Sequence, residues 1–146
     1  ALNSVLKLKK ISAIEINKVA FNELKKLNYV SPTNKSVIDY IPKKKYDLVL
    51  SKGFLIHINP NKLKKVYSNI YKSCKKNGHI LICEYYNQTP VSVNYRGNKN
   101  VLFKRDFAGE ILKKFSKTTL VDYGFQYRND KFPQDDMTWF LLKKHE

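Results

Sequence analysis

The sequence lacks long apolar runs and has few cysteines. No stretch approaches the ~20 consecutive apolar residues that a membrane-spanning helix needs. The two cysteines, Cys74 and Cys83, fall in a predicted helix and a predicted buried strand and do not have metal-ligand spacing. Reduced thiols of this kind are typical of cytoplasmic proteins. We therefore predict a cytoplasmic globular protein that uses neither a membrane nor a metal ion.

Acidic side chains and arginines are also scarce. The chain has 12 acidic residues against 28 lysines and arginines, which gives a net charge of +16. Such a charge could drive nucleic-acid binding by neutralising phosphates. Only Arg96, Arg105 and Arg128 are arginines, however, and arginine is the residue preferred for forked phosphate and base contacts. We predict a lysine-coated surface without a specific nucleic-acid partner, and a non-catalytic basic binding module stays as an alternative.

Glycine is scarce as well. The 146 residues contain five glycines and no G-x-G pair, so the glycine-rich turn of many nucleotide-binding folds is not found. A hydrophobic content of 42% with 27% charged residues argues against intrinsic disorder. We expect one domain, residues 1–146, that buries roughly 68–70% of its unfolded surface.

Predicted strands and helices alternate along the chain. Apolar or β-branched segments predict strands at 11–16, 29–33, 46–50, 79–84, 119–127 and 137–142. Helices are predicted after the cap residues Asn17, Asn59 and Asp106. This order favours a doubly wound, Rossmann-like α/β fold with a mostly parallel sheet, in which the last two strands form an antiparallel pair. Residues 85 to about 103 show no period, and so long a loop is usually functional or disordered.

Polar side chains lie just after the ends of the predicted strands, where open α/β sheets bind their ligands. Glu15 could accept hydrogen bonds from two ribose hydroxyls, or it could be a solvent-facing charge. His57 could act as a general base because its ordinary pKa lies near neutrality, or it could be a packed structural residue. Glu84 and the tyrosines after it could hold a polyhydroxylated substrate.

Two arginines and two aspartates complete the candidates. Arg96 and Arg105 could hold an acidic acceptor through forked hydrogen bonds to a carboxylate, although ordinary surface arginines would look the same. Asp135 and Asp136 could offer a base, and a turn with two solvated acids explains them equally well.

Several segments together resemble a known family. They are YDLVLSKG, SKGFLIHINP, LICEYYNQTPVSVNYRG, LFKRDFAGE, LVDYGFQYR and FPQDDMTWFLL. With these segments and the strand-end carboxylate Glu15, the chain resembles the class I S-adenosylmethionine-dependent methyltransferases. More narrowly, it is similar to the bacterial pseudaminic acid biosynthesis-associated methylases. The narrow match covers most of the chain from Tyr46 onward.

The resemblance implies an enzyme that transfers a methyl group from S-adenosylmethionine to a small acidic sugar, or to a precursor, in nonulosonic (pseudaminic) acid biosynthesis. For the cofactor, the resemblance implies that Glu15 binds the ribose. It implies that the short segment Ser36, Val37 and Ile38 surrounds the adenine, and that Ser51 and Lys52 form the mouth that faces the cofactor. For catalysis it implies His57 as the base, with Glu84 as second choice. The acceptor-binding residues are Tyr86, Arg96 and Arg105.

The family's glycine-rich motif has no counterpart in this sequence. By resemblance, this motif and the first strand of the sheet would precede Ala1, so we expect an N-terminally truncated domain. A sheet without a central strand has unpaired edges, and we expect the isolated chain to be marginally stable or prone to aggregate. A nicotinamide-dependent Rossmann enzyme, which would use the same strand-end acid, stays as a further alternative.

Overall fold

The computed structural model describes residues 7–8, 10–129 and 136–146. The chain divides into two compact units, Ala1–Ile41 and Pro42–Glu146, and each is described by itself. The expectation of a single domain stays a prediction. None of the described helices is long and apolar enough to cross a membrane.

The first unit is built on a parallel strand pair. Strand β1 (Ile11–Glu15) pairs with strand β2 (Val30–Asn34), and helix α2 (Lys18–Lys25) connects them. The helix begins as predicted, because the Asn17 side chain accepts hydrogen bonds from two backbone N–H groups of the first turn. Pairing continues past the strands, where the Lys35 N–H donates to the Glu15 carbonyl. The two carboxyl ends therefore lie at the same edge.

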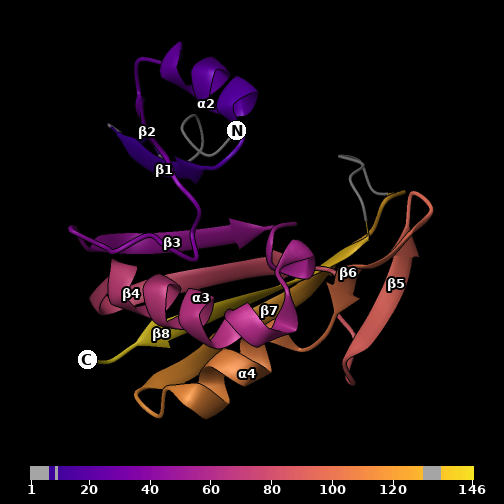
Figure 1. The fold of residues 1–146 in the computed structure, drawn as a ribbon. Coiled ribbons are helices and arrows are strands. Elements are labelled where there is room, and N and C mark those ends of the chain that lie inside the picture. Colours follow the sequence, from indigo (N-terminus) through magenta and orange to yellow (C-terminus); the bar gives the residue numbers. More distant parts are fainter. Residues whose placement is uncertain (1–6, 9, 130–135) are drawn as a thin grey trace. The chain divides into compact units, whose positions relative to one another are not determined.

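The second unit contains a mixed four-stranded sheet with the order β3-β4-β8-β7 (Figure 1). Its strands are β3 (Tyr46–Lys52), β4 (Cys74–Glu84), β7 (Thr118–Gln126) and β8 (Met137–Lys144). Strand β4 runs parallel to β3 and antiparallel to β8, which is also antiparallel to β7. The predicted Rossmann-like fold with a terminal antiparallel pair is thereby confirmed.

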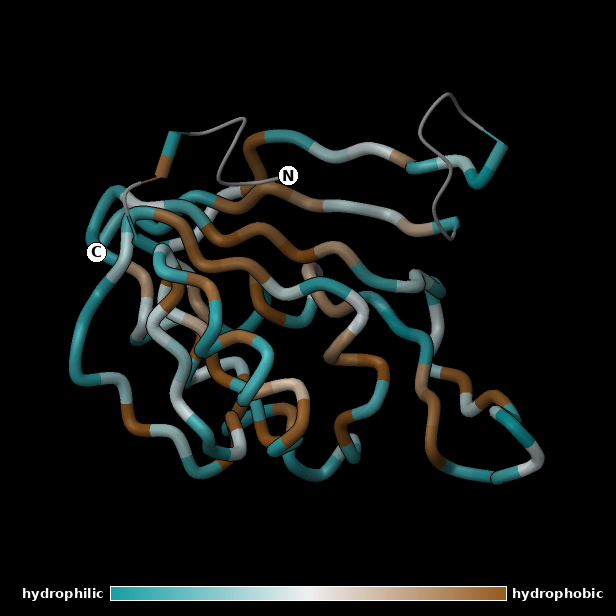
Figure 2. Tube along the Cα trace, turned by 90° about the horizontal axis from the view of Figure 1, so that it is seen from above, coloured by the Kyte–Doolittle hydropathy of each residue, from teal (hydrophilic) through white to brown (hydrophobic). Residues whose placement is uncertain are grey.

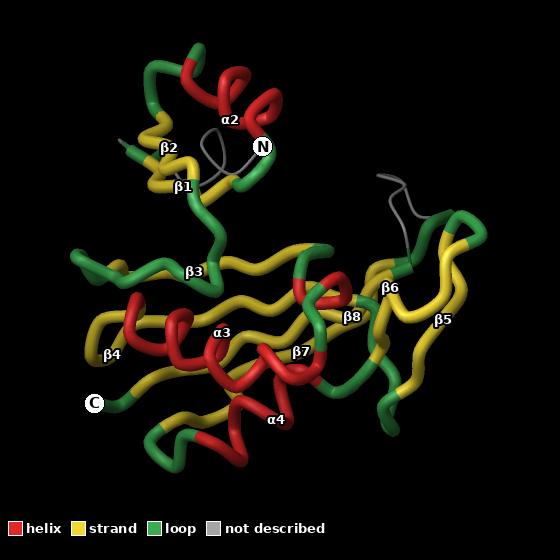
Figure 3. Tube along the Cα trace, viewed as in Figure 1, coloured by secondary structure: helices red, strands yellow, loops and turns green. Residues whose placement is uncertain are grey.

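Two helices pack on one face of this sheet (Figure 3). Helix α3 (Pro60–Ser73) begins at the predicted cap, where Asn59 Oδ1 accepts a hydrogen bond from the Asn61 N–H. Helix α4 (Phe107–Lys114) begins where Asp106 accepts one from the Gly109 N–H. Their buried stripes meet the apolar strands, which are drawn in brown in Figure 2. Fully buried side chains of this core are Leu55, Leu63, Val66, Ile80, Ile82, Phe107, Ile111 and Leu142.

The first residues of β4, after α3, include one in the left-handed conformation. Asn77, and not the glycine that follows it, takes this conformation, with φ of 59°. Gly78 has another reason to be glycine. A Cβ there would lie 2.9 Å from Cys74 Sγ and 3.0 Å from the Asp47 carbonyl oxygen, so the backbones of the two strands could not approach as they do.

The expected irregular loop after β4 is a β-hairpin, so that prediction was wrong. Strand β5 (Val91–Tyr95) pairs with strand β6 (Asn98–Lys104) across a two-residue turn. Both turn residues have positive φ, 49° at Arg96 and 78° at Gly97, which is typical of the tight turns that join paired strands. An arginine in the first turn position hides this signal, because asparagine, aspartate or glycine is usual there.

Candidate functional site

The candidate site lies at the carboxyl ends of β3 and β4. These two strands are parallel, so both ends reach the same edge of the sheet. The chain leaves β3 at Gly53, whose N–H donates to the Cys83 carbonyl over 2.9 Å and whose φ is +59°. This conformation suits a residue without a Cβ. A short 3-10 helix, η1 (Leu55–His57), comes next and leads to the start of α3.

Glu84 holds this turn to the end of β4. Its Oε1 atom accepts hydrogen bonds from Ser51 Oγ at 2.9 Å, from the Phe54 N–H at 3.1 Å and from the Leu55 N–H at 3.0 Å. The residue is only 2% exposed, and its Oε2 atom is buried without a hydrogen-bond partner in the described part of the chain. Burial raises the pKa of the Glu84 carboxyl, and the donated hydrogen bonds oppose that shift.

A cavity of about 570 Å³ opens beside this turn. The turn and β4 line one side, and the β5–β6 hairpin lines the other. The lining residues are Lys52, Gly53, Ile56, His57, Tyr85, Val93, Asn94, Tyr95, Leu102, Lys104 and Met137. Pockets for small molecules commonly have volumes of about 300–1,000 Å³. The cavity is therefore large enough for a small-molecule ligand.

His57 lies at the edge of this cavity, as the sequence led us to expect. Its Nδ1 atom is 3.4 Å from the Val101 carbonyl oxygen of β6, and its ring is 5.8 Å from the Tyr95 ring. Both strands of the hairpin thus contact the imidazole. If Nδ1 carries the proton toward the carbonyl, Nε2 is the basic nitrogen.

Two cations, Lys52 and Lys104, line the cavity. Among the lining residues that the structure describes, none is an aspartate or a glutamate. Lys104 Nζ lies 5.3 Å from the centre of the Tyr85 ring, a cation–π distance. Tyr85 is one of the tyrosines after Glu84 that the sequence suggested for substrate binding, and Lys104 directly precedes the acceptor candidate Arg105. Leu102 and Lys104 are two residues apart in β6, so their side chains lie on the same face of the strand.

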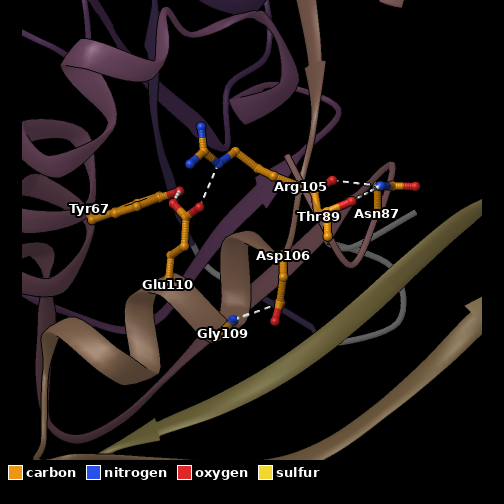
Figure 4. A network of polar contacts seen from close by, with 7 residues as sticks. All are labelled: Tyr67, Asn87, Thr89, Arg105, Asp106, Gly109 and Glu110. Carbon is orange, nitrogen blue, oxygen red and sulfur yellow. Dashed lines mark hydrogen bonds and ion pairs between the residues drawn. The ribbon is translucent and has the colours of Figure 1, made fainter. Parts of the chain in front are cut away.

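Arg105 lies in a different environment, between the two helices (Figure 4). Its Nε atom donates to Glu110 Oε1, and Tyr67 Oη donates to Glu110 Oε2 at 2.7 Å. Burial and the bond to Glu110 raise the pKa of the Tyr67 phenol, so this hydroxyl stays protonated. Arg105 does not line the cavity. Its bond to Glu110 attaches the end of the hairpin to α4, and Glu110 in turn connects α4 to Tyr67 of α3.

Arg96 and Tyr86 also lie outside the cavity lining. Arg96 is exposed at the tip of the hairpin, with its guanidinium 5.2 Å from the centre of the Tyr95 ring. Tyr86 is 42% exposed and packs against the Phe140 ring at 5.8 Å. The structure therefore brings His57 and Lys52 together at the cavity, whereas Arg96 and Tyr86 lie outside its lining.

In the first unit, Glu15 and the segment Ser36-Val37-Ile38 lie at the carboxyl ends of adjacent parallel strands. The Glu15 side chain is half-buried, and its Oε1 atom accepts a hydrogen bond from the Asn17 N–H at 2.7 Å. The next segment forms a turn in which the Ile38 N–H donates to Ser36 Oγ. Val37 and Ile38 are half-buried and offer an apolar surface.

Of the two candidate aspartates, the structure describes only Asp136. Asp135 lies outside the described residues. Asp136 accepts a hydrogen bond from the Arg128 N–H at 2.9 Å, so it closes the loop between β7 and β8. Among the residues that the structure describes, no three His, Cys, Asp or Glu side chains gather in a way that could hold a metal ion.

No family model matches the chain, and no curated protein matches it. Solved structures do. The N-methyltransferase NodS from Bradyrhizobium japonicum WM9 superposes with a TM-score of 0.70 at 15% identity, over 94% of this chain and 75% of that chain. A SAM-dependent methyltransferase from Methanosarcina mazei gives 0.70 at 8% identity, over 98% and 85%. The fold is that of the S-adenosylmethionine-dependent methyltransferases.

A third similar structure contains ligands. The 1,6-didemethyltoxoflavin-N1-methyltransferase from Burkholderia thailandensis, with bound 1,6-didemethyltoxoflavin and S-adenosylhomocysteine, superposes with a TM-score of 0.69 at 13% identity. The alignment covers 99% of this chain and 75% of that chain. At these identities the likeness establishes the methyltransferase fold of this chain, and its chemistry has to be argued from its own residues.

Proposed function

We propose that the chain belongs to an enzyme that transfers a methyl group from S-adenosylmethionine to a small molecule. The observation that carries this proposal is the cavity at the carboxyl ends of β3 and β4, in a fold that the chain has in common with S-adenosylmethionine-dependent methyltransferases. Open α/β sheets bind their ligands at this edge. The cavity contains an imidazole, two lysines and two phenols, which can orient an acceptor and accept a proton.

The residues at the strand ends of the first unit fit the adenosine part of the cofactor. Glu15 ends β1 as a half-buried carboxylate whose position is fixed by the Asn17 N–H. A carboxylate in this position can accept hydrogen bonds from both ribose hydroxyls. Val37 and Ile38, at the end of the adjacent strand, offer the half-buried apolar surface that a planar adenine needs. We therefore propose Glu15, Ser36, Val37 and Ile38 as cofactor-binding residues.

The residues of the second unit would act on the acceptor. When bound, S-adenosylmethionine supplies an electrophilic methyl group on a sulfonium. We propose that His57 accepts the acceptor proton on Nε2, while the Val101 carbonyl holds Nδ1. Lys52 lines the same cavity and can orient a negatively charged group. Ser51 is 6% exposed and donates to Glu84, so we propose that it supports the cofactor-facing end of β3 through this hydrogen bond and does not contact the cofactor itself.

For the acceptor we propose a small acidic sugar, or a precursor, in nonulosonic (pseudaminic) acid biosynthesis. The support is the resemblance of the segments from Tyr46 onward, together with a cavity whose described lining contains two lysines and two phenols and no carboxylate. Arg96 and Tyr86 flank the hairpin and could contact a long acceptor, whereas Arg105 would act by holding the hairpin. The free, buried thiols of Cys74 and Cys83 fit a reducing cytoplasm, which we propose as its location.

The test is transfer of an isotopically labelled methyl group. The full chain is incubated with S-adenosylmethionine that carries a ¹³C methyl and with nine-carbon acidic sugars, and the products are analysed by mass spectrometry. We expect one labelled methyl on the sugar. His57→Gln should lower the rate by about 10²–10⁴-fold, the usual contribution of a positioned base. His145→Gln, at an exposed histidine bonded to Thr119, is the matched control.

Two outcomes would change the proposal. Full turnover in His57→Gln would remove His57 as the base. Labelling of neutral small molecules, with none of the acidic sugars, would overturn the acceptor class while leaving methyl transfer in place.

A further inference from the structure

Glu84 is the most deeply buried acid among the described residues, and its contacts are unusual. Three donors converge on one oxygen, Oε1, and the other oxygen is buried without a hydrogen-bond partner in the part of the chain that the structure describes. Burying a carboxylate in this way is costly, because an ion loses its water and only part of the loss is replaced. A native structure that keeps such a group therefore calls for a structural or functional reason.

The three donors belong to one short segment. Ser51 is the penultimate residue of β3, and the Phe54 and Leu55 N–H groups open the 3-10 helix η1. Helix starts leave N–H groups without partners inside the helix, and a carboxylate satisfies them well. A side chain at the end of β4 thus binds both ends of the turn that leaves β3.

That turn carries a large part of the cavity wall. Lys52 and Gly53 lie between the two anchor points, and Ile56 and His57 come directly after them. Neither Glu84 nor the three residues that donate to its Oε1 atom line the cavity. Its influence on a ligand therefore passes through the backbone of the turn.

We propose that Glu84 is a positioning residue: its carboxylate fixes the turn 51–57 and thereby sets the place of the His57 imidazole at the cavity. The functional meaning of the site rests on the proposed function, whereas the geometry of the turn does not. The inference also replaces the expectation of Glu84 as a second candidate base, because the side chain is 2% exposed and does not line the cavity, so an acceptor in the cavity would not reach it.

The test reads the histidine directly. The chain has three histidines, so the imidazole C–H signals of the full chain can be resolved by NMR, and the His57 signal is assigned with His57→Gln. In Glu84→Gln, which keeps size and loses charge, we expect the His57 signal to move or broaden while the His79 and His145 signals stay in place. Ser51→Ala, which removes one donor, should cause a smaller change of the same signal.

The control separates positioning from general loss of stability. Ile111→Val trims a fully buried side chain of α4 and should lower stability without moving the His57 signal. An unchanged His57 signal in Glu84→Gln would overturn the proposal, and so would an equal change in Ile111→Val. Because the NMR readout needs neither cofactor nor acceptor, it stays decisive if methyl transfer is not found.

Discussion

The two strand-end glutamates, Glu15 in the first unit and Glu84 in the second, look alike in the sequence and differ in the structure. Each ends a strand that runs parallel to its neighbour. Glu15 is half-buried and accepts one hydrogen bond from its own loop, at Asn17. Glu84 is 2% exposed and accepts three from a neighbouring strand and turn.

The difference comes from the path of the chain after the adjacent strand. After β3 the chain folds back over the end of β4 through η1, so its N–H groups reach Glu84. After β2 the chain forms a turn at Ser36 that bonds within itself. A carboxylate that is covered by its neighbour becomes part of the framework, whereas one that is left half-open can bind a ligand. Three predictions test this contrast.

The strongest effect should be on stability when each glutamate is replaced by alanine. Glu84→Ala leaves the buried Ser51 hydroxyl, the buried Leu55 N–H and the part-buried Phe54 N–H without their acceptor, and we expect it to lower the free energy of unfolding by about 2–4 kcal/mol. Glu15→Ala removes one local hydrogen bond and should cost about 0.5–1.5 kcal/mol. Urea denaturation of both variants measures the difference. Equal losses would contradict the contrast.

A second effect concerns the backbone between the Glu84 anchor points. Gly53 has φ of +59°, and alanine in that conformation is strained by about 1–2 kcal/mol. We expect Gly53→Ala and, at the exposed hairpin tip, Gly97→Ala each to lower the free energy of unfolding by about this amount, because an added Cβ would meet only Met137 Cε at 3.8 Å in the first case and nothing within 4 Å in the second. Both glycines have positive φ, so a much larger loss for Gly53 in urea denaturation would show that the turn resists adjustment. A smaller loss would mean that the turn relaxes.

The weakest effect is the pH dependence that Glu84 adds. Burial raises the pKa of its carboxyl above the ordinary value of 4.5. The folded state then binds this proton more tightly than the unfolded chain does, so the contribution is full below about pH 4.5 and is lost as the pH rises through the folded pKa. The stability of the native chain minus that of Glu84→Gln, measured by denaturation at a series of pH values, should fall across this window. A flat or rising difference would show that the hydrogen bonds outweigh burial.

Much of the fold could be predicted because its signals are local. The cap residues Asn17, Asn59 and Asp106 begin the helices as expected, and the short strand near residue 30 is present as β2. The hairpin was missed because β5 and β6 are largely exposed and carry no buried alternation. Exposed strands depend on pairing with each other, which a periodicity argument does not detect.

The site was harder to predict than the fold, for a related reason. His57 and Lys52 lie at or just beyond the end of β3, so strand order alone places them at the cavity. Arg105 was expected at the acceptor, but its spacing to Glu110 on α4 binds it there instead. Lys104, one residue earlier, is the last residue of β6 and lines the cavity, whereas Arg105 follows the strand. Assigning either residue required knowing where this strand ends.

The central claim is that this methyltransferase fold binds S-adenosyl cofactors through the Glu15 carboxylate. It can be tested by titration calorimetry of S-adenosylhomocysteine against the full chain, Glu15→Gln and Glu23→Gln, because Glu23 is an exposed acid of the same unit whose carboxylate pairs with Lys26 on the protein surface. We predict one binding site and a loss of affinity of about tenfold or more in Glu15→Gln, as expected for hydrogen bonds to a charged group, with no change in Glu23→Gln. Equal binding by all three proteins, or no binding by the native chain, would contradict the claim.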